Sequence, residues 1–344
     1  MLSDAKKCIA LLLLSTSWHG ACAQTREDFL QARDRIEWEA GGLYEGRFDD
    51  GTIFRIALAY PEPEAVPQRA AHAFAQSVWT PRHYTGTPST LLAAGSANGQ
   101  TRLAVANARG VASEETYAVT LTPDHASGRG VWSGPRIGEQ RNFTLRRSVP
   151  FVGVVVARPA SAELAAFSDY YREHGFTFSS VFPVLGNRDA DEWIRDEAGI
   201  CQDSGECANA VRIDWQSPSL VSLRALVWGD SGGAHGNGYS VTRQYGIENG
   251  AMTQLALDDF IDPGAACRNQ VTKSIAASLH ALDMRLPDPR GNDPWRGAKF
   301  TPTPDGIAFH YNSYEAGSYA QGAPTVFVPR DDMAACTQHL PARD

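Results

Sequence analysis

The sequence offers no apolar run long enough to cross a membrane. A spanning helix needs about 20 consecutive apolar residues, and no stretch of the 344-residue chain reaches that length. Basic residues do not cluster, so the sequence also lacks a polybasic segment that would attract anionic lipid. The formal net charge is −8, which makes nucleic acid an unsuitable partner. We therefore expect no transmembrane segment and no nucleic-acid partner.

Lysine and cysteine are scarce. Of the 31 basic residues, four are lysine and 27 are arginine, a bias that we attribute to genome composition. The six cysteines include no C-x₂-C pair, which argues against structural zinc. Asp189, Asp191 and Glu192 could suggest another metal site, but acids at the start of a helix also complement its dipole. We expect no metal and no cofactor.

The first 23 residues have the features of a signal peptide. Lys6 and Lys7 supply positive charge, residues 9–14 form an apolar core, and Ala23 ends a small-x-small cleavage motif. Alternatively, Cys22 becomes the lipidated N-terminus of a lipoprotein. Cleavage after Ala23 changes the formal charge from −8 to −9, because two lysines and one aspartate leave. The sequence thus predicts a mature protein in the periplasm or outside the cell.

Four cysteines remain in the mature chain. An even number of cysteines in an exported protein indicates disulfide bonds, here two. Three pairings are possible, and we favour a short loop closed by Cys201–Cys207 with a long one closed by Cys267–Cys336.

Residues 24–148 predict a short helix followed by a small β-rich domain. The spacing of apolar residues favours a helix within residues 27–40. Asp49-Asp50-Gly51 separates two strand-like segments, residues 43–48 and 52–58, and so predicts a hairpin. Further strands are expected at residues 101–106, 116–122, 130–133 and 142–146. Short strands in close succession are typical of an antiparallel sandwich or barrel.

Arg147 to Pro150 mark the expected boundary, and residues 149–344 predict a mixed α/β domain, which makes the whole chain α+β. Helices are expected at residues 160–174, 189–198 and 266–282. The last helix carries an apolar stripe of Val271, Ile275, Leu279 and Leu282. Strands are expected at residues 211–215, 220–228, 239–245, 306–311 and 325–328.

Gly229-Asp230-Ser231-Gly232-Gly233 matches the nucleophile loop of chymotrypsin-like serine proteases, and Ala70-Ala71-His72 echoes their histidine segment. A nucleophilic serine needs a base within hydrogen-bond reach and a third group that orients the base. His72 lies in an alanine-rich stretch, however, and a helix and a proline-rich loop follow Ser231 where closing barrel strands would be expected. We therefore disfavour a protease.

The run from Ser231 to Asn237 resembles the Gly-Gly-Ala-His signature of the extracytoplasmic domain of RsiV-type anti-sigma factors, which deacetylases of the PdaC type also carry. A tyrosine-rich segment, residues 311–322, resembles the closing motif of that family, and residues 325–329 resemble its final strand. The order of strands and of the helix between these segments is similar too. The resemblance extends over roughly residues 150–340.

The resemblance implies a domain that works at the cell envelope and, in the RsiV type, binds lysozyme. Because the chain shows neither a sigma-binding segment nor a deacetylase domain, we expect a soluble periplasmic binding protein. It would contact a peptidoglycan hydrolase or peptidoglycan itself, and the sharper expectation is an inhibitor or immunity factor against such a hydrolase. The alternative is a hydrolase of envelope substrates, which makes an enzymatic role the second choice. The candidate ligand-binding residues are Ser231, Gly232, Gly233, Ala234, His235, Tyr311, Tyr314 and Tyr319.

Overall fold

The computed structural model describes residues 29–60, 64–65, 79–81, 88–97, 99–106, 112–136, 138–160, 162–167, 169–201, 206–230, 235–286, 295 and 297–342. The expected signal peptide, including Cys22, lies outside these residues. Within them, no helix has the length and apolarity that crossing a membrane requires.

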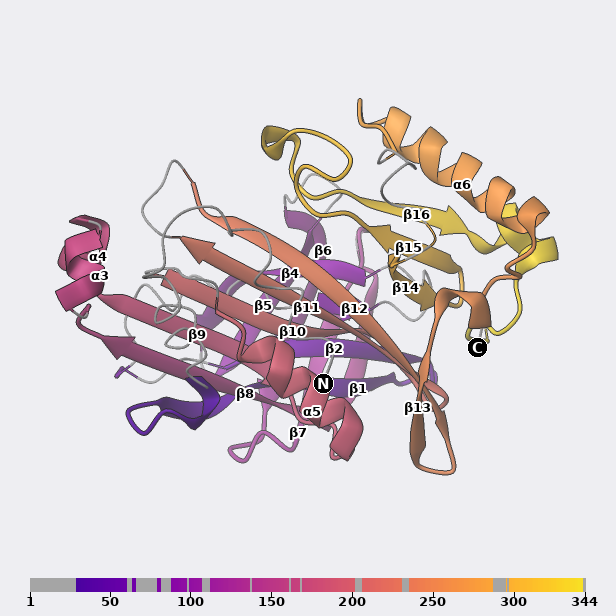
Figure 1. The fold of residues 1–344 in the computed structure, drawn as a ribbon. Helices are drawn as coiled ribbons and strands as arrows, with labels where there is room; N and C mark the ends of the chain where they lie inside the picture. Colours follow the sequence, from indigo (N-terminus) through magenta and orange to yellow (C-terminus); the bar gives the residue numbers. More distant parts are fainter. Residues whose placement is uncertain are drawn as a thin grey trace, which may run out of the picture.

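Most of the described chain is β-structure (Figure 1). A large mixed sheet contains β1 (Ile36–Phe48), β2 (Ile53–Ala59), β3 (Trp79–Pro81), β4 (Pro88–Ala97), β5 (Gln100–Ala106), β6 (Ala112–Leu121), β7 (Ser127–Ser133), β8 (Gln140–Arg158), β9 (Phe176–Pro183), β10 (Glu206–Ser217), β11 (Leu220–Asp230), β12 (Asn237–Glu248) and β13 (Ala251–Leu255). A small antiparallel sheet contains β14 (Lys299–Thr303), β15 (Gly306–His310) and β16 (Thr325–Pro329). The helices of the described residues are α3 (Ala162–Phe167), α4 (Asp169–His174), α5 (Arg188–Ala198) and α6 (Ala265–His280). The predicted α+β class is therefore confirmed, with strands predominating.

The large sheet runs in the order β13-β12-β11-β10-β9-β8-β7-β6-β5-β4-β3, and β1 lies between β8 and β2. The pairing of β9 with β10 is parallel, whereas β8 pairs antiparallel with its neighbours. In the N-terminal half, the strands β2-β1-β8-β7-β6-β5-β4-β3 form one continuous series. Its first strand, β2, contacts its last strand, β3, so the two ends of the series come together. Aromatic rings fill the space enclosed, with Phe54 lying 5.2 Å from Phe143 and 5.7 Å from Tyr117, centroid to centroid.

The expected helix over residues 27–40 is wrong. The chain makes one 3₁₀ turn at Phe29–Gln31 and enters β1 at Ile36. Ile36 and Trp38 are partly buried while Glu37 and Glu39 are exposed, an alternation of period two that belongs to a strand. The predicted hairpin is confirmed, because β1 pairs with β2 around a turn in which Gly51 has φ +85°.

The expected boundary at residues 148–149 lies inside β8. The first half of this 19-residue strand pairs with β7, the second half pairs with β9, and β1 follows both halves on the other edge. The division of the chain into two domains stays a prediction. However, β8 crosses the expected boundary without a break, and β1 pairs with β8 on both sides of it.

The C-terminal half is built in layers. Helix α5 packs on β9, β10 and β11, while the small sheet packs through β14 against β10, β11 and β12. Helix α6 lies on the outside against β16 (Figure 1). Val271, Ile275 and Leu279 are buried as expected. Leu282 is 51% exposed, because α6 ends at His280 and the expected stripe does not continue.

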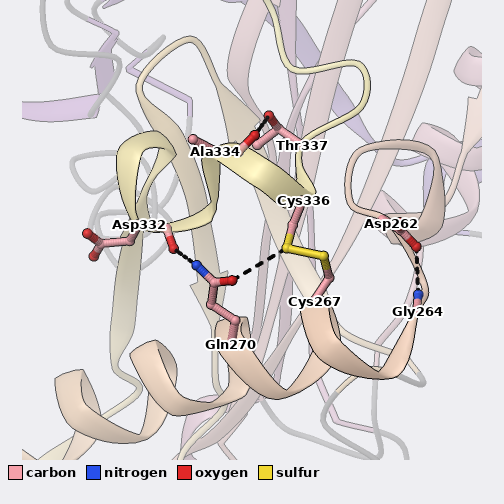
Figure 2. The surroundings of a disulfide bond; sticks show 8 residues. All are labelled: Asp262, Gly264, Cys267, Gln270, Asp332, Ala334, Cys336 and Thr337. Carbon is pink, nitrogen blue, oxygen red and sulfur yellow. Dashed lines mark hydrogen bonds between the residues drawn. A yellow bond between two sulfur atoms is a disulfide. The ribbon is translucent and has the colours of Figure 1, made fainter.

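One disulfide bond joins Cys267 at the start of α6 to Cys336 in the 3₁₀ segment after β16 (Figure 2). This confirms the long-range pairing that we expected, and closing a loop of 69 residues stabilises the fold by about 4 kcal/mol in the loop-entropy model. The structure forms no bond between Cys201 and Cys207, contrary to expectation. The Cys207 thiol is buried at the start of β10 and lies 3.6 Å from the carbonyl oxygen of Ile200.

Candidate ligand-binding site

Three residues that the sequence singled out meet at one place on the surface. His235 precedes β12, whereas Tyr314 and Tyr319 lie in the segment between β15 and β16. Ring contacts link His235 to Tyr319 and Tyr319 to Tyr314. We call these three side chains the aromatic ladder. Ser231, Gly232, Gly233 and Ala234 fall outside the described residues, so their assignment to the site stays a prediction.

His235 and Tyr319 converge on one backbone carbonyl. Their rings stack at 3.9 Å between centroids with an interplanar angle of 17°. The Tyr319 hydroxyl donates to the carbonyl oxygen of Gly236 at 2.8 Å, and His235 Nδ1 lies 2.9 Å from the same oxygen. A carbonyl can only accept, so Nδ1 carries the proton, and in the neutral ring Nε2 is an acceptor. The contact therefore fixes both the ring and its tautomer.

Gly236 is a glycine because a side chain has no room there. A Cβ at this position would overlap the six-membered ring of Trp228 on β11. This close approach brings the Gly236 carbonyl within reach of Tyr319. The glycine that directly follows the Gly-Gly-Ala-His signature thus has a packing function at the base of the aromatic ladder.

Tyr314 has an unusual backbone conformation. Its φ is +69°, and the Glu315 N–H donates to the carbonyl oxygen of Asn312 at 3.1 Å to close a turn. Tyr314 is the third residue of this turn, where a positive φ is normally supplied by glycine or asparagine. Its side chain is nevertheless 61% exposed, with its ring centroid 5.6 Å from that of Tyr319. A bulky residue therefore occupies a strained position and projects towards solvent.

Polar contacts hold the turn in place. Glu315 accepts hydrogen bonds from the Asn312 N–H at 2.7 Å and from Lys299 Nζ at 2.7 Å to each carboxylate oxygen. Asn312 Oδ1 in turn accepts from the Ser240 backbone N–H at 2.8 Å and from its hydroxyl at 3.0 Å. The turn is thus anchored to β14 through Lys299 and to β12 through Ser240.

Tyr311 does not belong to the exposed ladder. It is buried, and burial, reinforced by the Glu315 carboxylate, raises the pKa of its hydroxyl to about 12. Its backbone N–H donates to the carbonyl oxygen of Pro324 at 2.9 Å. Tyr311 therefore closes the base of the loop instead of contributing a surface ring.

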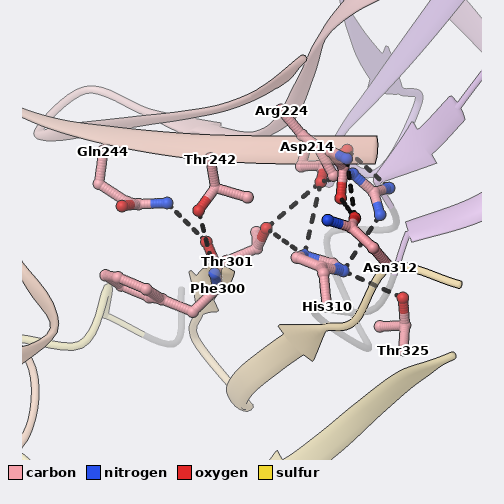
Figure 3. A network of polar contacts seen from close by, with 10 residues as sticks. Asp214, Arg224, Thr242, Gln244, Phe300, Thr301, His310, Asn312 and Thr325 are labelled. Carbon is pink, nitrogen blue, oxygen red and sulfur yellow. Dashed lines mark hydrogen bonds and ion pairs between the residues drawn. The ribbon is translucent and has the colours of Figure 1, made fainter. Parts of the chain in front are cut away.

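A buried polar ring lies beneath that base, formed by Asp214, Arg224, His310 and Thr301 (Figure 3). Arg224 Nε lies 2.7 Å from Asp214 Oδ2, and Arg224 Nη1 lies 3.1 Å from His310 Nδ1. His310 Nε2 lies 2.9 Å from the Thr301 hydroxyl, which donates to Asp214 Oδ2 at 3.3 Å. Because a guanidinium only donates, Nδ1 is the acceptor and Nε2–H is the donor of His310.

The ring connects the two sheets and keeps His310 neutral. Asp214 and Arg224 come from β10 and β11, while Thr301 and His310 come from β14 and β15. Burial, together with the nearby Arg224 charge and that of Lys299, lowers the pKa of His310 well below its usual value. His310 Nδ1 also lies 3.0 Å from the hydroxyl of Thr325, so the ring holds both ends of the 311–324 loop.

Sequence reasoning missed the residues that support the ladder. Trp228, Asn312 and Glu315 lie within or beside the quoted motifs, but their partners are distant in sequence. Asn312 bonds across 72 residues to Ser240. Only the clustering of tyrosines in residues 311–322 signalled this region. His72 and Ser231 of the disfavoured protease reading lie outside the described residues.

Comparison with known families finds a match to DUF3298, a family described as proteins of unknown function, over residues 258–331. This family is related to RsiV-like domains. The matched segment includes Tyr314 and Tyr319 but not His235, and it is shorter than the resemblance over residues 150–340 that the sequence motifs indicated.

Solved structures of the same family are similar in part. A DUF3298 family protein from Pseudomonas aeruginosa PAO1 is 15% identical, with a TM-score of 0.37, covering 47% of this chain and 85% of that protein. A member of the family from Bacteroides fragilis NCTC 9343 is 14% identical, with a TM-score of 0.34, covering 56% of this chain and 95% of the other. A search of curated proteins finds no match.

Proposed function

We propose that this chain is a soluble periplasmic binding protein of the cell envelope and that the aromatic ladder is its contact surface. Its target is a lysozyme-like peptidoglycan hydrolase or peptidoglycan itself. The resemblance to the RsiV type supports the hydrolase as target, and the presence of the same domain in peptidoglycan deacetylases of the PdaC type supports peptidoglycan. The signal-peptide features and the Cys267–Cys336 bond support an oxidising compartment outside the cytoplasm.

The observation that carries this proposal is the exposed, strained position of Tyr314. A non-glycine residue in the left-handed region costs roughly 1–2 kcal/mol. Burial of the ring does not offset that cost, since 61% of the side chain remains exposed. Strain of this kind persists where the surrounding structure enforces it, often at binding sites. Folding alone does not explain an exposed ring at this strained position, whereas contact with a ligand would explain it.

The anchoring of the turn supports the same proposal. Glu315 and Asn312 fix the turn from two strands, and Tyr319 is tied to Gly236. A surface that is already ordered loses little conformational entropy when a partner binds, so more of the contact energy appears as affinity.

A more specific version of the proposal is an inhibitor or immunity factor that shields the cell from a peptidoglycan hydrolase. Such a protein would need to reach the hydrolase outside the cytoplasm, as the signal-peptide features predict. The alternative, a hydrolase of envelope substrates, needs a base beside a nucleophile. Among the described residues, His235 contacts the Gly236 carbonyl and the Tyr319 ring, and this arrangement favours a binding role.

The test uses the exported chain and two immobilised or particulate targets, hen lysozyme and purified peptidoglycan sacculi. We expect the wild-type protein to be retained by at least one of them. Tyr314→Gly should weaken retention at least tenfold, while Tyr314→Phe should keep it within threefold. Failure of the wild type to bind either target, with its folding verified, would contradict the proposal.

A further inference from the structure

The aromatic ladder ends in a single free ring. His235 covers one side of Tyr319, and Tyr314 lies next to Tyr319 with 61% of its surface exposed. Among the described residues, the large apolar side chains that are exposed are Tyr314 and Leu282. Within the part of the chain that the structure describes, the large exposed apolar surface at the ladder is therefore that of one tyrosine ring.

The size of this apolar surface distinguishes a protein partner from a saccharide. A specific protein interface covers about 800 Å² on each partner and has an apolar centre made of several side chains. One exposed tyrosine does not provide such a centre. A pyranose ring, by contrast, has an apolar face of C–H groups that matches one aromatic face, and the ring of tyrosine carries the negative quadrupole that attracts such C–H groups.

The charges beside the turn also favour a neutral sugar as the ligand. Glu315 is the acid of the turn, and both of its carboxylate oxygens lie 2.7 Å from Lys299 Nζ. The two charges compensate each other, so the turn presents no net charge to a ligand. His235 offers Nε2 as a hydrogen-bond acceptor beside the rings, which suits the hydroxyl groups of a neutral sugar.

We infer that the aromatic ladder binds a neutral saccharide, with a pyranose ring stacked on Tyr314 and a sugar hydroxyl donating to His235 Nε2. This inference rests on the proposed function, because it assigns the ligand class of the same surface. Among the proposed targets it selects the glycan of peptidoglycan over a hydrolase. Tyr319 positions the outer ring and links it to the imidazole.

The experiment titrates the full exported chain with chitotetraose, a neutral β-1,4-linked tetramer of N-acetylglucosamine, by calorimetry. Tyr314→Gly removes the ring, and Tyr314→Phe keeps it. Leu282→Ala is the matched control, since it removes the other large exposed apolar side chain. We expect Tyr314→Gly to raise Kd at least tenfold, and Tyr314→Phe and Leu282→Ala to stay within threefold. His235→Phe, which keeps a ring but removes the acceptor, should raise Kd about threefold to tenfold.

The outcomes separate this inference from the proposed function. If chitotetraose does not bind at millimolar concentration while lysozyme is retained through Tyr314, the saccharide inference is overturned and the proposed function stands. If chitotetraose binds equally well to wild type and Tyr314→Gly, the inference is also overturned. If neither chitotetraose, sacculi nor lysozyme binds the folded protein, both proposals fail.

Discussion

Two turns in this molecule place an aromatic side chain where glycine is usual, and they use it differently. His125, between β6 and β7, has φ +53°, and Tyr314, between β15 and β16, has φ +69°. The His125 ring packs 4.0 Å from the ring of Tyr60, centroid to centroid, and its Nδ1 lies 4.0 Å from a carboxylate oxygen of Glu39. The Tyr314 ring projects into solvent.

The difference shows how backbone strain can be interpreted. At His125, contacts within the folded chain offset the strain, and the Tyr44 hydroxyl adds a hydrogen bond of 2.7 Å to its carbonyl oxygen. At Tyr314 the polar anchors hold the backbone, but the side chain gains little from the fold. A strained residue whose side chain is already satisfied needs no ligand, whereas one that remains exposed is a candidate for binding.

The largest expected effect comes from removing the support of the Tyr314 loop. Asp214→Ala deletes the carboxylate beside the buried Arg224 guanidinium, and breaking a buried ion pair costs about 3–5 kcal/mol. Denaturant unfolding measures this loss. Glu39→Ala removes a more exposed carboxylate, which faces both Arg147 and His125, and should cost less than the loss of Asp214. Equal losses would show that the buried ring does not have the supporting role that we assign to it.

Gly236→Ala should have the next largest effect. The new methyl group meets the Trp228 ring, and overpacking of this kind costs about 1–3 kcal/mol. The clash should also displace the carbonyl that Tyr319 and His235 share, so ligand affinity should fall with stability. Gly250→Ala is a useful contrast, because a Cβ there meets no atom within 4 Å and any cost should come from its φ of +82° alone. Unchanged ligand affinity in Gly236→Ala would separate Gly236 from the aromatic ladder.

The His125 turn should respond weakly to the loss of its ring. His125→Gly relieves roughly 1–2 kcal/mol of backbone strain but loses a ring contact of about 0.5–1.5 kcal/mol and the contact with the Glu39 carboxylate. We expect the free energy of unfolding to change by less than about 1 kcal/mol. A gain well above that, measured by thermal unfolding, would show that the strain at His125 is as poorly compensated as at Tyr314.

A pH dependence of the unfolding free energy should arise from His310, which supports the Tyr314 loop. Asp214, Arg224 and Lys299 are the charged groups near His310. The pKa of His310 is lowered in the folded protein, so the unfolded chain binds more protons below its usual pKa of 6.5. Stability is therefore complete above about pH 6.5 and falls as the pH drops below it. In His310→Gln the slope of unfolding free energy between pH 5 and 7 should flatten; an unchanged slope would contradict the assignment.

Sequence patterns predicted ordinary turns and missed the two unusual ones. Asp49-Asp50-Gly51 was expected to turn, and Gly51 has a positive φ between β1 and β2, because glycine tolerates that region. His125 and Tyr314 carry no such signal. Their conformations are imposed by contacts distant in sequence, among them the Ser240–Asn312 hydrogen bonds, which no local pattern records.

The expected domain boundary has a related explanation. The expected boundary, Arg147 to Pro150, contains a proline, which cannot donate to a sheet. In the structure Pro150 continues β8 opposite Gly42, next to an irregularity in register where Leu43 pairs with Val149 and Tyr44 with Arg147. Proline is tolerated beside such bulges. Strand types and most strand positions were predictable, but continuity across the proline depended on pairing with β1.

The central claim is that Tyr314 is held in a strained turn for the sake of a ligand. It is tested by measuring the unfolding free energy and the chitotetraose affinity of Tyr314→Gly on the same preparation. Glycine removes both the strain and the ring, so we predict a gain in stability of about 1 kcal/mol together with at least a tenfold loss of affinity. A loss of stability with unchanged affinity would show instead that Tyr314 serves the fold.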